Sequence, residues 1–266
     1  ATNEEAVNAF ESHLREQLKA VFQGAGAKSI VTVRLFDPDP ISYLESPIEL
    51  AKEIGVLLAQ KDRDGDEFTA QEELDSKIQE LENSKKARKK NTATGSRAIR
   101  LLVQRPDLLA AELKAILTAS KEGRGGGGET EEGSETGPLT RIVVPFVADF
   151  REVDFFTKKF EEISLEMGEK AKIGVEVDTV RGCLGADKIA ETADFITLST
   201  SNLTESTFSM DLKEAQKKLL PDYQEKKILN SKDLLEKVPK SVEDLMKICA
   251  NEAKQTKADG EIGLFS

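Results

Sequence analysis

The chain has 266 residues, of which 38% are hydrophobic and 33% charged, and its formal net charge is −11. This length and apolar content suffice for one sizeable hydrophobic core, so a single α/β domain can account for the whole chain. The acidic balance argues against nucleic acid and anionic membranes as partners, and no apolar run approaches the roughly 20 residues that a membrane span requires.

The first half of the chain alternates between helical and strand patterns. Apolar residues at helical spacing predict an amphipathic helix over 4–22, and the β-branched run SIVTVRLF predicts a buried strand over 29–36 that DPDP ends. GSRAIRLLV at 95–103 is interpreted as a strand that leads into a helix over 106–120, which has Pro106 in its first turn. Further helical patterns lie near 47–59 and 69–88.

A low-complexity segment separates this half from the next. Residues 121–138 contain the run GRGGGGETEEGSETG and are predicted to form a flexible insert loop. Beyond it, strand and helix patterns alternate again. The predicted strands are 141–147, 172–178, 194–200 and 261–265, and the predicted helices include 151–168, 185–192 and 242–255.

This order of elements predicts an α/β fold. About six apolar strands with helices between them favour a parallel sheet that helices cover. In parallel (β/α) barrels, functional residues follow the carboxyl ends of the strands. That rule singles out Arg34–Asp37, Arg97–Arg100, Asp178 and Ser199–Glu205.

Several segments resemble one known family. VTVRLFDP (31–38) resembles the VTIRLLDP segment of pyruvate phosphate dikinases, and NTATGSRAIRLL (91–102) resembles their N-P-x-L-G-x-R-x-x-R-L stretch, with similarity to enzyme I of the sugar phosphotransferase system as well. KIGVEVDTVRGCLGADKIA (172–190) is similar, without gaps, to K-V-G-T-M-I-E-I-P-R-A-A-L-T-A-D-E-I-A of the dikinases. The chain is therefore identified as a member of the phosphoenolpyruvate (PEP)-utilising enzymes.

The resemblance implies that residues 1–266 form a single domain, the C-terminal (β/α)8 TIM-type barrel of this family. Because about six strands are visible, matching the second to the seventh of eight, we expect an incomplete barrel. Either sequence is missing at both ends, or a protein partner covers the open edges. The family barrel binds PEP or pyruvate with Mg²⁺, and a histidine on a separate domain carries the phosphoryl group.

Three arginines and one aspartate match functional positions of the family. Arg34 and Arg97 match the arginines that bind the phosphate, which suits a planar guanidinium that donates two hydrogen bonds and stays charged. Arg100 matches the second arginine of the same motif. Asp178 stands where the family has its Mg²⁺-binding glutamate, and it keeps the charge on a side chain one methylene shorter.

Other site positions depart from the family. STSNLTE (199–205) aligns with G-T-N-D-L-T-Q, so Ser201 replaces the substrate-binding asparagine and Asn202 replaces the second metal-binding aspartate. Weaker Mg²⁺ binding is expected, because Asn202 brings an oxygen but no charge. Phe265 falls where the family has its acid/base cysteine, and a phenyl ring transfers no proton.

Two further motifs are given their ordinary structural interpretation. DRDGDEFTAQEE (62–73) resembles a calcium-binding EF-hand loop but has Glu67 where that loop needs glycine. The only histidine, His13, lies in an amphipathic helix without the surroundings of a phosphohistidine motif.

Location and function stay open between stated options. Cys183 and Cys249 have neither metal nor disulfide spacing, which fits a reducing compartment, either cytoplasmic or organellar, with a plastid as one option because the chain begins at Ala1. We favour a catalytically degenerate barrel that serves as a structural or binding subunit of a larger assembly. The alternatives are the active PEP/pyruvate domain of a multidomain dikinase and a small-anion sensor that uses Arg34 and Arg97.

Overall fold

The computed structural model describes residues 3–26, 28–37, 75–79, 95–124, 138–257 and 260–265. The chain divides into two compact units, residues 1–37 with 98–266, and residues 38–97. In the second unit, residues 75–79 form a helical turn inside the pattern predicted at 69–88. The helix predicted at 47–59 and the EF-hand-like run at 62–73 lie outside the described residues.

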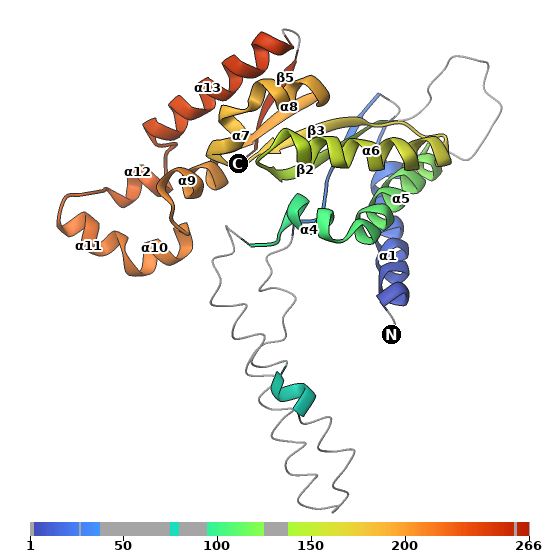
Figure 1. Ribbon diagram of the computed structural model, residues 1–266, viewed down its shortest axis with the longest axis horizontal. Coiled ribbons are helices and arrows are strands. Elements are labelled where there is room, and N and C mark those ends of the chain that lie inside the picture. The colour runs from blue at the N-terminus through green and yellow to red at the C-terminus, as the bar shows by residue number, and fades with distance from the viewer. Residues whose placement is uncertain are drawn as a thin grey trace, which may run out of the picture. The chain divides into compact units, whose positions relative to one another are not determined.

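The first unit carries the alternating elements that the sequence predicts, labelled in Figure 1. In chain order they are α1 (Asn3–Gly24), β1 (Ile30–Arg34), α4 (Ala98–Gln104), α5 (Pro106–Gly123), β2 (Leu139–Val147), α6 (Phe150–Met167), β3 (Lys172–Val177), α7 (Val180–Leu184), α8 (Ala186–Thr192), β4 (Phe195–Ser199), α9 (Thr200–Phe208), α10 (Leu212–Lys218), α11 (Leu220–Glu225), α12 (Ser231–Leu235), α13 (Lys240–Thr256) and β5 (Glu261–Phe265).

The five described strands form one parallel sheet in the order β1-β2-β3-β4-β5. Each strand is followed by at least one helix before the next strand begins, so successive strands return parallel to one another. The sheet curls into half of a barrel, and the unit is an incomplete TIM-type (β/α) barrel. The α/β fold class predicted from the sequence is confirmed.

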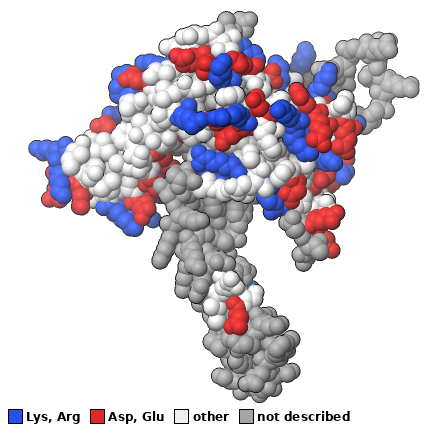
Figure 2. Space-filling model, in the orientation of Figure 1, with Lys and Arg blue, Asp and Glu red and all other residues white. Residues whose placement is uncertain are grey.

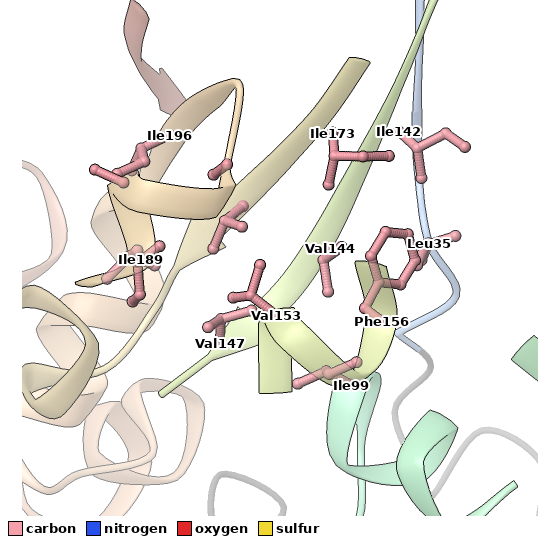
Figure 3. Packing of buried hydrophobic residues seen from close by; sticks show 14 of the residues in the cluster. Leu35, Ile99, Ile142, Val144, Val147, Val153, Phe156, Ile173, Ile189 and Ile196 are labelled. Carbon is pink, nitrogen blue, oxygen red and sulfur yellow. The ribbon is translucent and has the colours of Figure 1, made fainter. Parts of the chain in front are cut away.

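The helices that follow the strands form an outer layer (Figure 1). Along this layer α1 packs against α5, α5 against α6, α6 against α8, and α8 against α13. Between the two layers lies one apolar core, in which side chains of the strands meet side chains of the helices. Figure 3 shows Val144 and Ile173 from the sheet beside Val153 and Phe156 from α6.

One predicted strand is a helix. The segment 95–103 was expected to be a strand, but Ala98–Gln104 is α4, so five strands rather than six are found among the described residues. β1 and β2 pair directly with each other, Ile30 opposite Leu139, which leaves no place for a strand between them. Ile99 and Leu102 are both fully buried, and their spacing of three is that of one helix face.

None of the helices in the described ranges is long and apolar enough to cross a membrane.

Candidate functional site

Charged side chains gather at the carboxyl ends of β1 and β3. Arg34 is the last residue of β1, and Asp37 follows it in the next loop. Glu176 lies inside β3, and Asp178 comes directly after that strand. Because side chains alternate along a strand, Glu176 and Asp178 are on the same face of β3.

Arg34 is held by two acidic side chains. Its Nε donates to Glu176 Oε2 at 2.6 Å, and its Nη2 donates to Glu176 Oε1 at 3.2 Å and to Asp37 Oδ2 at 2.9 Å. The side chains of Glu176 and Asp37 are each 1% exposed, whereas that of Arg34 is 28% exposed. The guanidinium therefore already makes, with Glu176, the two-point contact that it would offer to a phosphate.

The electrostatics of Arg34 follow from this arrangement. Burial by itself lowers the pKa of the Arg34 guanidinium, but hydrogen bonds and charges from Glu176 and Asp37 outweigh burial and raise that pKa above its ordinary value. One cation faces two carboxylates here, so the immediate surroundings of Arg34 carry no surplus positive charge.

Asp178 is fully buried and only partly satisfied. Its Oδ2 accepts a hydrogen bond from the backbone N–H of Phe146 at 2.9 Å, and the side chain also hydrogen-bonds Asn202. Its Oδ1 is buried without a hydrogen-bond partner among the described residues. Phe146 has φ of 62°, an uncommon conformation for a bulky residue, and lies where the β2–β3 register shifts.

Burial decides the protonation of Asp178. Desolvation, assisted by the negative charge of Glu176, raises the pKa of Asp178 to about 8. The carboxyl group is therefore mostly protonated at neutral pH, and as a neutral acid it is a poor metal ligand.

The two other predicted arginines differ in their placement. The guanidinium of Arg100, on α4, lies over the Phe146 ring at 4.8 Å from its centroid, so this side chain approaches the β2 bulge that contacts Asp178. Arg97 is the last residue of the second unit, and its position relative to the sheet is not described.

The stretch after β4 forms a helix start. Ser199 is the N-cap of α9, and its Oγ accepts from the backbone N–H of Asn202 at 3.4 Å. Ser201 is exposed and lines a shallow cavity of about 220 Å³ with Thr200 and Thr204. Phe265 pairs with Ser199 in the β4–β5 register, so its backbone reaches the same end of the sheet.

These residues do not fit a magnesium site of two carboxylates. Glu176 is committed to Arg34, the Asn202 amide is engaged by Asp178, and the carboxyl group of Asp178 is held neutral. Within the described ranges, no three His, Cys, Asp or Glu side chains converge on a point where a metal ion would sit. Mg²⁺ prefers charged oxygen ligands, so we derive no chemistry through a metal here.

Glu176 is the site residue that the sequence reasoning missed. The signal was present in KIGVEVD, where a charged residue interrupts an apolar strand at a spacing of two from Asp178. Glu112, on α5, was missed as well. It is 2% exposed, its Oε1 accepts from the backbone N–H of Phe36 at 2.7 Å, and its Oε2 has no partner in the described part of the chain.

Comparison with known proteins places this geometry in a context. Residues 2–263 match the family model described as PEP-utilising enzyme, PEP-binding domain. The chain is 30% identical over 243 residues to the pyruvate, phosphate dikinase of Entamoeba histolytica, a match that covers 88% of this chain and 25% of that protein. With the enzyme of Clostridium symbiosum the identity is 27% over 271 residues, covering 98% of this chain and 28% of that protein.

Pyruvate, phosphate dikinase 2 of Oryza sativa subsp. japonica is 29% identical over 240 residues, covering 88% of this chain and 25% of that protein. The chain thus spans about a quarter of the length of the curated relatives that it matches.

Proposed function

Since this chain belongs to the PEP-utilising enzymes, as a PEP-binding domain of the pyruvate phosphate dikinase type, we propose that it is a catalytically degenerate member. It keeps the barrel architecture and serves as a structural or binding component of a larger assembly. The relatives are named dikinases, but the match covers only about a quarter of their length, so their activity is not carried over to this chain.

The ion pair of Arg34 with Glu176 carries this proposal. A phosphate that bound Arg34 would have to displace a carboxylate that is 1% exposed and makes two hydrogen bonds to the guanidinium. The displaced carboxylate would remain buried without its counter-charge, and an unpaired buried charge costs about 3–5 kcal/mol. PEP is itself an anion, so Glu176 opposes its binding through both competition and repulsion.

The substituted positions support the same conclusion. The aligned metal ligands are Asp178, held neutral by burial, and Asn202, which carries no charge. The aligned position of the acid/base cysteine is Phe265. A chain with these residues lacks the charge for strong Mg²⁺ binding and the group for proton transfer to an enolate carbon.

The test is ligand-induced thermal stabilisation. The wild-type chain is expected to show no increase in melting temperature with millimolar PEP and Mg²⁺, because a ligand stabilises only a state that it binds. The Glu176→Gln variant removes the competing charge while its amide oxygen can still accept a hydrogen bond from Arg34. This variant is expected to melt lower than the wild type without ligand and to gain a PEP-dependent increase.

Glu112→Gln is the matched control, because it neutralises a buried carboxyl group that hydrogen-bonds Phe36 and not Arg34. It should gain no response to PEP. The proposal is wrong if the wild-type chain is stabilised by PEP with Mg²⁺ and Arg34→Ala abolishes the effect. It is also wrong if the wild-type chain interconverts PEP and pyruvate when supplied with a phosphorylated carrier domain.

A further inference from the structure

A second polar cavity lies at the opposite end of the sheet from Arg34. Its volume is about 670 Å³, and it opens where β1, β2 and β3 begin. Its lining includes Lys28 and Ile30 at the start of β1, Leu139 at the start of β2, and Lys170 and Lys172 at the start of β3. Arg124, which follows α5, completes the lining used below.

The lysines of this cavity retain charge that the protein does not neutralise. Lys28 and Lys170 are exposed and form no ion pair with any described residue. Lys172 is also exposed and has only a charge interaction with Glu261. The one acidic residue of the lining, Asp194, accepts a hydrogen bond from the backbone N–H of Ile173 at 2.8 Å.

Beneath the lysines, buried polar groups fix the position of Arg124. Arg124 Nη2 donates to Ser120 Oγ at 2.9 Å and lies 3.3 Å from Glu169 Oε2. Ser120 in turn shares a hydrogen bond of 2.7 Å with Thr140, and both of these side chains are almost completely buried. Arg124 Nε is buried with no hydrogen-bond partner within the described ranges, so a donor of this guanidinium is still unused.

We propose that this cavity binds a small molecule that carries at least two adjacent phosphate groups. Four cations from three segments of the chain surround it, and lysine and arginine are the usual ligands of phosphate oxygens. A volume of about 670 Å³ exceeds what a single phosphate fills and falls in the range of metabolite sites. Ile30 and Leu139, 52% and 37% exposed, offer an apolar wall for the rest of such a molecule.

A larger charged cleft elsewhere on the unit shows the difference between paired and unpaired cations. That cleft, about 660 Å³, is lined by Arg151, Arg181 and Lys188 among others. Both arginines bind Asp149, and Lys188 binds Glu191 at 2.7 Å. Its cations are therefore already neutralised, in keeping with the mixed signs over the face that Figure 2 shows, and it serves as an internal control.

The experiment measures binding of inorganic tripolyphosphate to the full chain by isothermal titration calorimetry at low salt. One molecule is expected to bind per chain, more weakly as salt is raised, because the contacts are charged. The Lys28→Ala/Lys170→Ala double variant removes two exposed side chains and should weaken binding at least about tenfold, since even one charge-assisted contact is worth about that factor. Lys188→Ala, the matched control, should bind like the wild type.

Two further arms identify the source of the affinity. A nucleoside diphosphate that binds more tightly than pyrophosphate would support a role for the wall of Ile30 and Leu139, whereas equal affinities would restrict the site to the phosphate groups. The Glu176→Gln variant should bind tripolyphosphate like the wild type, so this result is independent of the function proposed above. The inference is overturned if no binding occurs at millimolar ligand, or if the double variant and the wild type bind equally.

Discussion

Two buried carboxyl groups, Glu112 and Asp178, share an unusual environment in this protein. In each, one oxygen accepts a backbone N–H, from Phe36 and Phe146 respectively, and the other oxygen is buried without a partner among the described residues. Desolvation raises the pKa of each to about 8. Both acids therefore fold in the neutral form, because burying the charge would cost more than losing it.

The pH dependence of stability should report on Glu112. Its pKa is about 8 in the folded chain against a model value of 4.5, so the folded state binds the proton more tightly than the unfolded state. The resulting stability is fully present below pH 4.5 and is lost as pH rises through 8. We expect Glu112→Gln to reduce the loss of unfolding free energy between these two pH values, by an amount on the order of a few kcal/mol.

Denaturant unfolding at several pH values between those limits measures this effect. Glu166→Gln, at an exposed position on α6, is the control and should leave the pH dependence unchanged. Identical slopes for the wild type and Glu112→Gln would show that Glu112 is ionised in the folded protein.

At the scale of elements, the close contact between α7 and the end of β2 positions the residues around Asp178. Gly182 of α7 is buried, and a Cβ placed on it would lie 2.7 Å from the carbonyl oxygen of Val147. Thr179 caps this short helix by accepting from the backbone N–H of Gly182 at 3.0 Å. The turn directly after Asp178 is therefore fixed by both packing and a hydrogen bond.

Gly182→Ala should consequently destabilise the fold. The added methyl group meets backbone, which cannot rotate away as a side chain can, and such overpacking costs about 1–3 kcal/mol. Thermal or denaturant unfolding measures the loss.

Gly185→Ala is a matched control at the end of the same helix. Its Cβ would lie 3.5 Å from the nearest atom, an ordinary contact, and its φ is −113°. We expect this variant to be at least as stable as Gly182→Ala by about 1 kcal/mol or more. Equal stabilities would mean that α7 is not held against Val147 as described.

At the scale of the whole molecule, the strand order divides the described sheet into a centre and two margins. β2, β3 and β4 each have a strand on both sides, whereas β1 and β5 each pair with one described strand. Leu264 on β5 is 69% exposed, an unusual exposure for an apolar residue of a barrel strand. In the proposed assembly, this margin is where a protein partner would add contacts.

Hydrogen exchange can test that proposal. In the isolated chain, backbone amides of β3 should exchange slowly and those of β5 faster, because local opening needs less free energy at a sheet margin. In the native assembly, purified without denaturation, β5 amides should gain protection. An unchanged exchange rate for β5 in that assembly would argue against a partner at this margin.

Much of the fold follows from sequence patterns alone. The β-branched run before Asp37 and the apolar runs at 141–147, 172–178 and 194–200 are each long enough, and different enough from helical spacing, to identify buried strands. The short segment 95–103 was wrong because an apolar run with arginines fits either element, and only the direct pairing of β1 with β2 excludes a strand there.

The candidate site divides in the same way. Motif similarity located Arg34, Asp178 and Asn202 at strand ends, and their roles stay predictions. It did not indicate that Glu176 faces Arg34, because these residues are 142 positions apart and meet only through the sheet. Nor did it indicate that Asp178 is held neutral, since that depends on how completely neighbouring elements exclude water.

Composition, periodicity and motif similarity by themselves determined the α/β class, the family and the residue types at the strand ends. Only the tertiary structure decided which charges meet, which carboxyl groups are buried, and which lysines remain without a partner. The physical reason is that hydrophobic patterning is local along the chain, whereas ion pairing and desolvation depend on distances between segments that folding brings together.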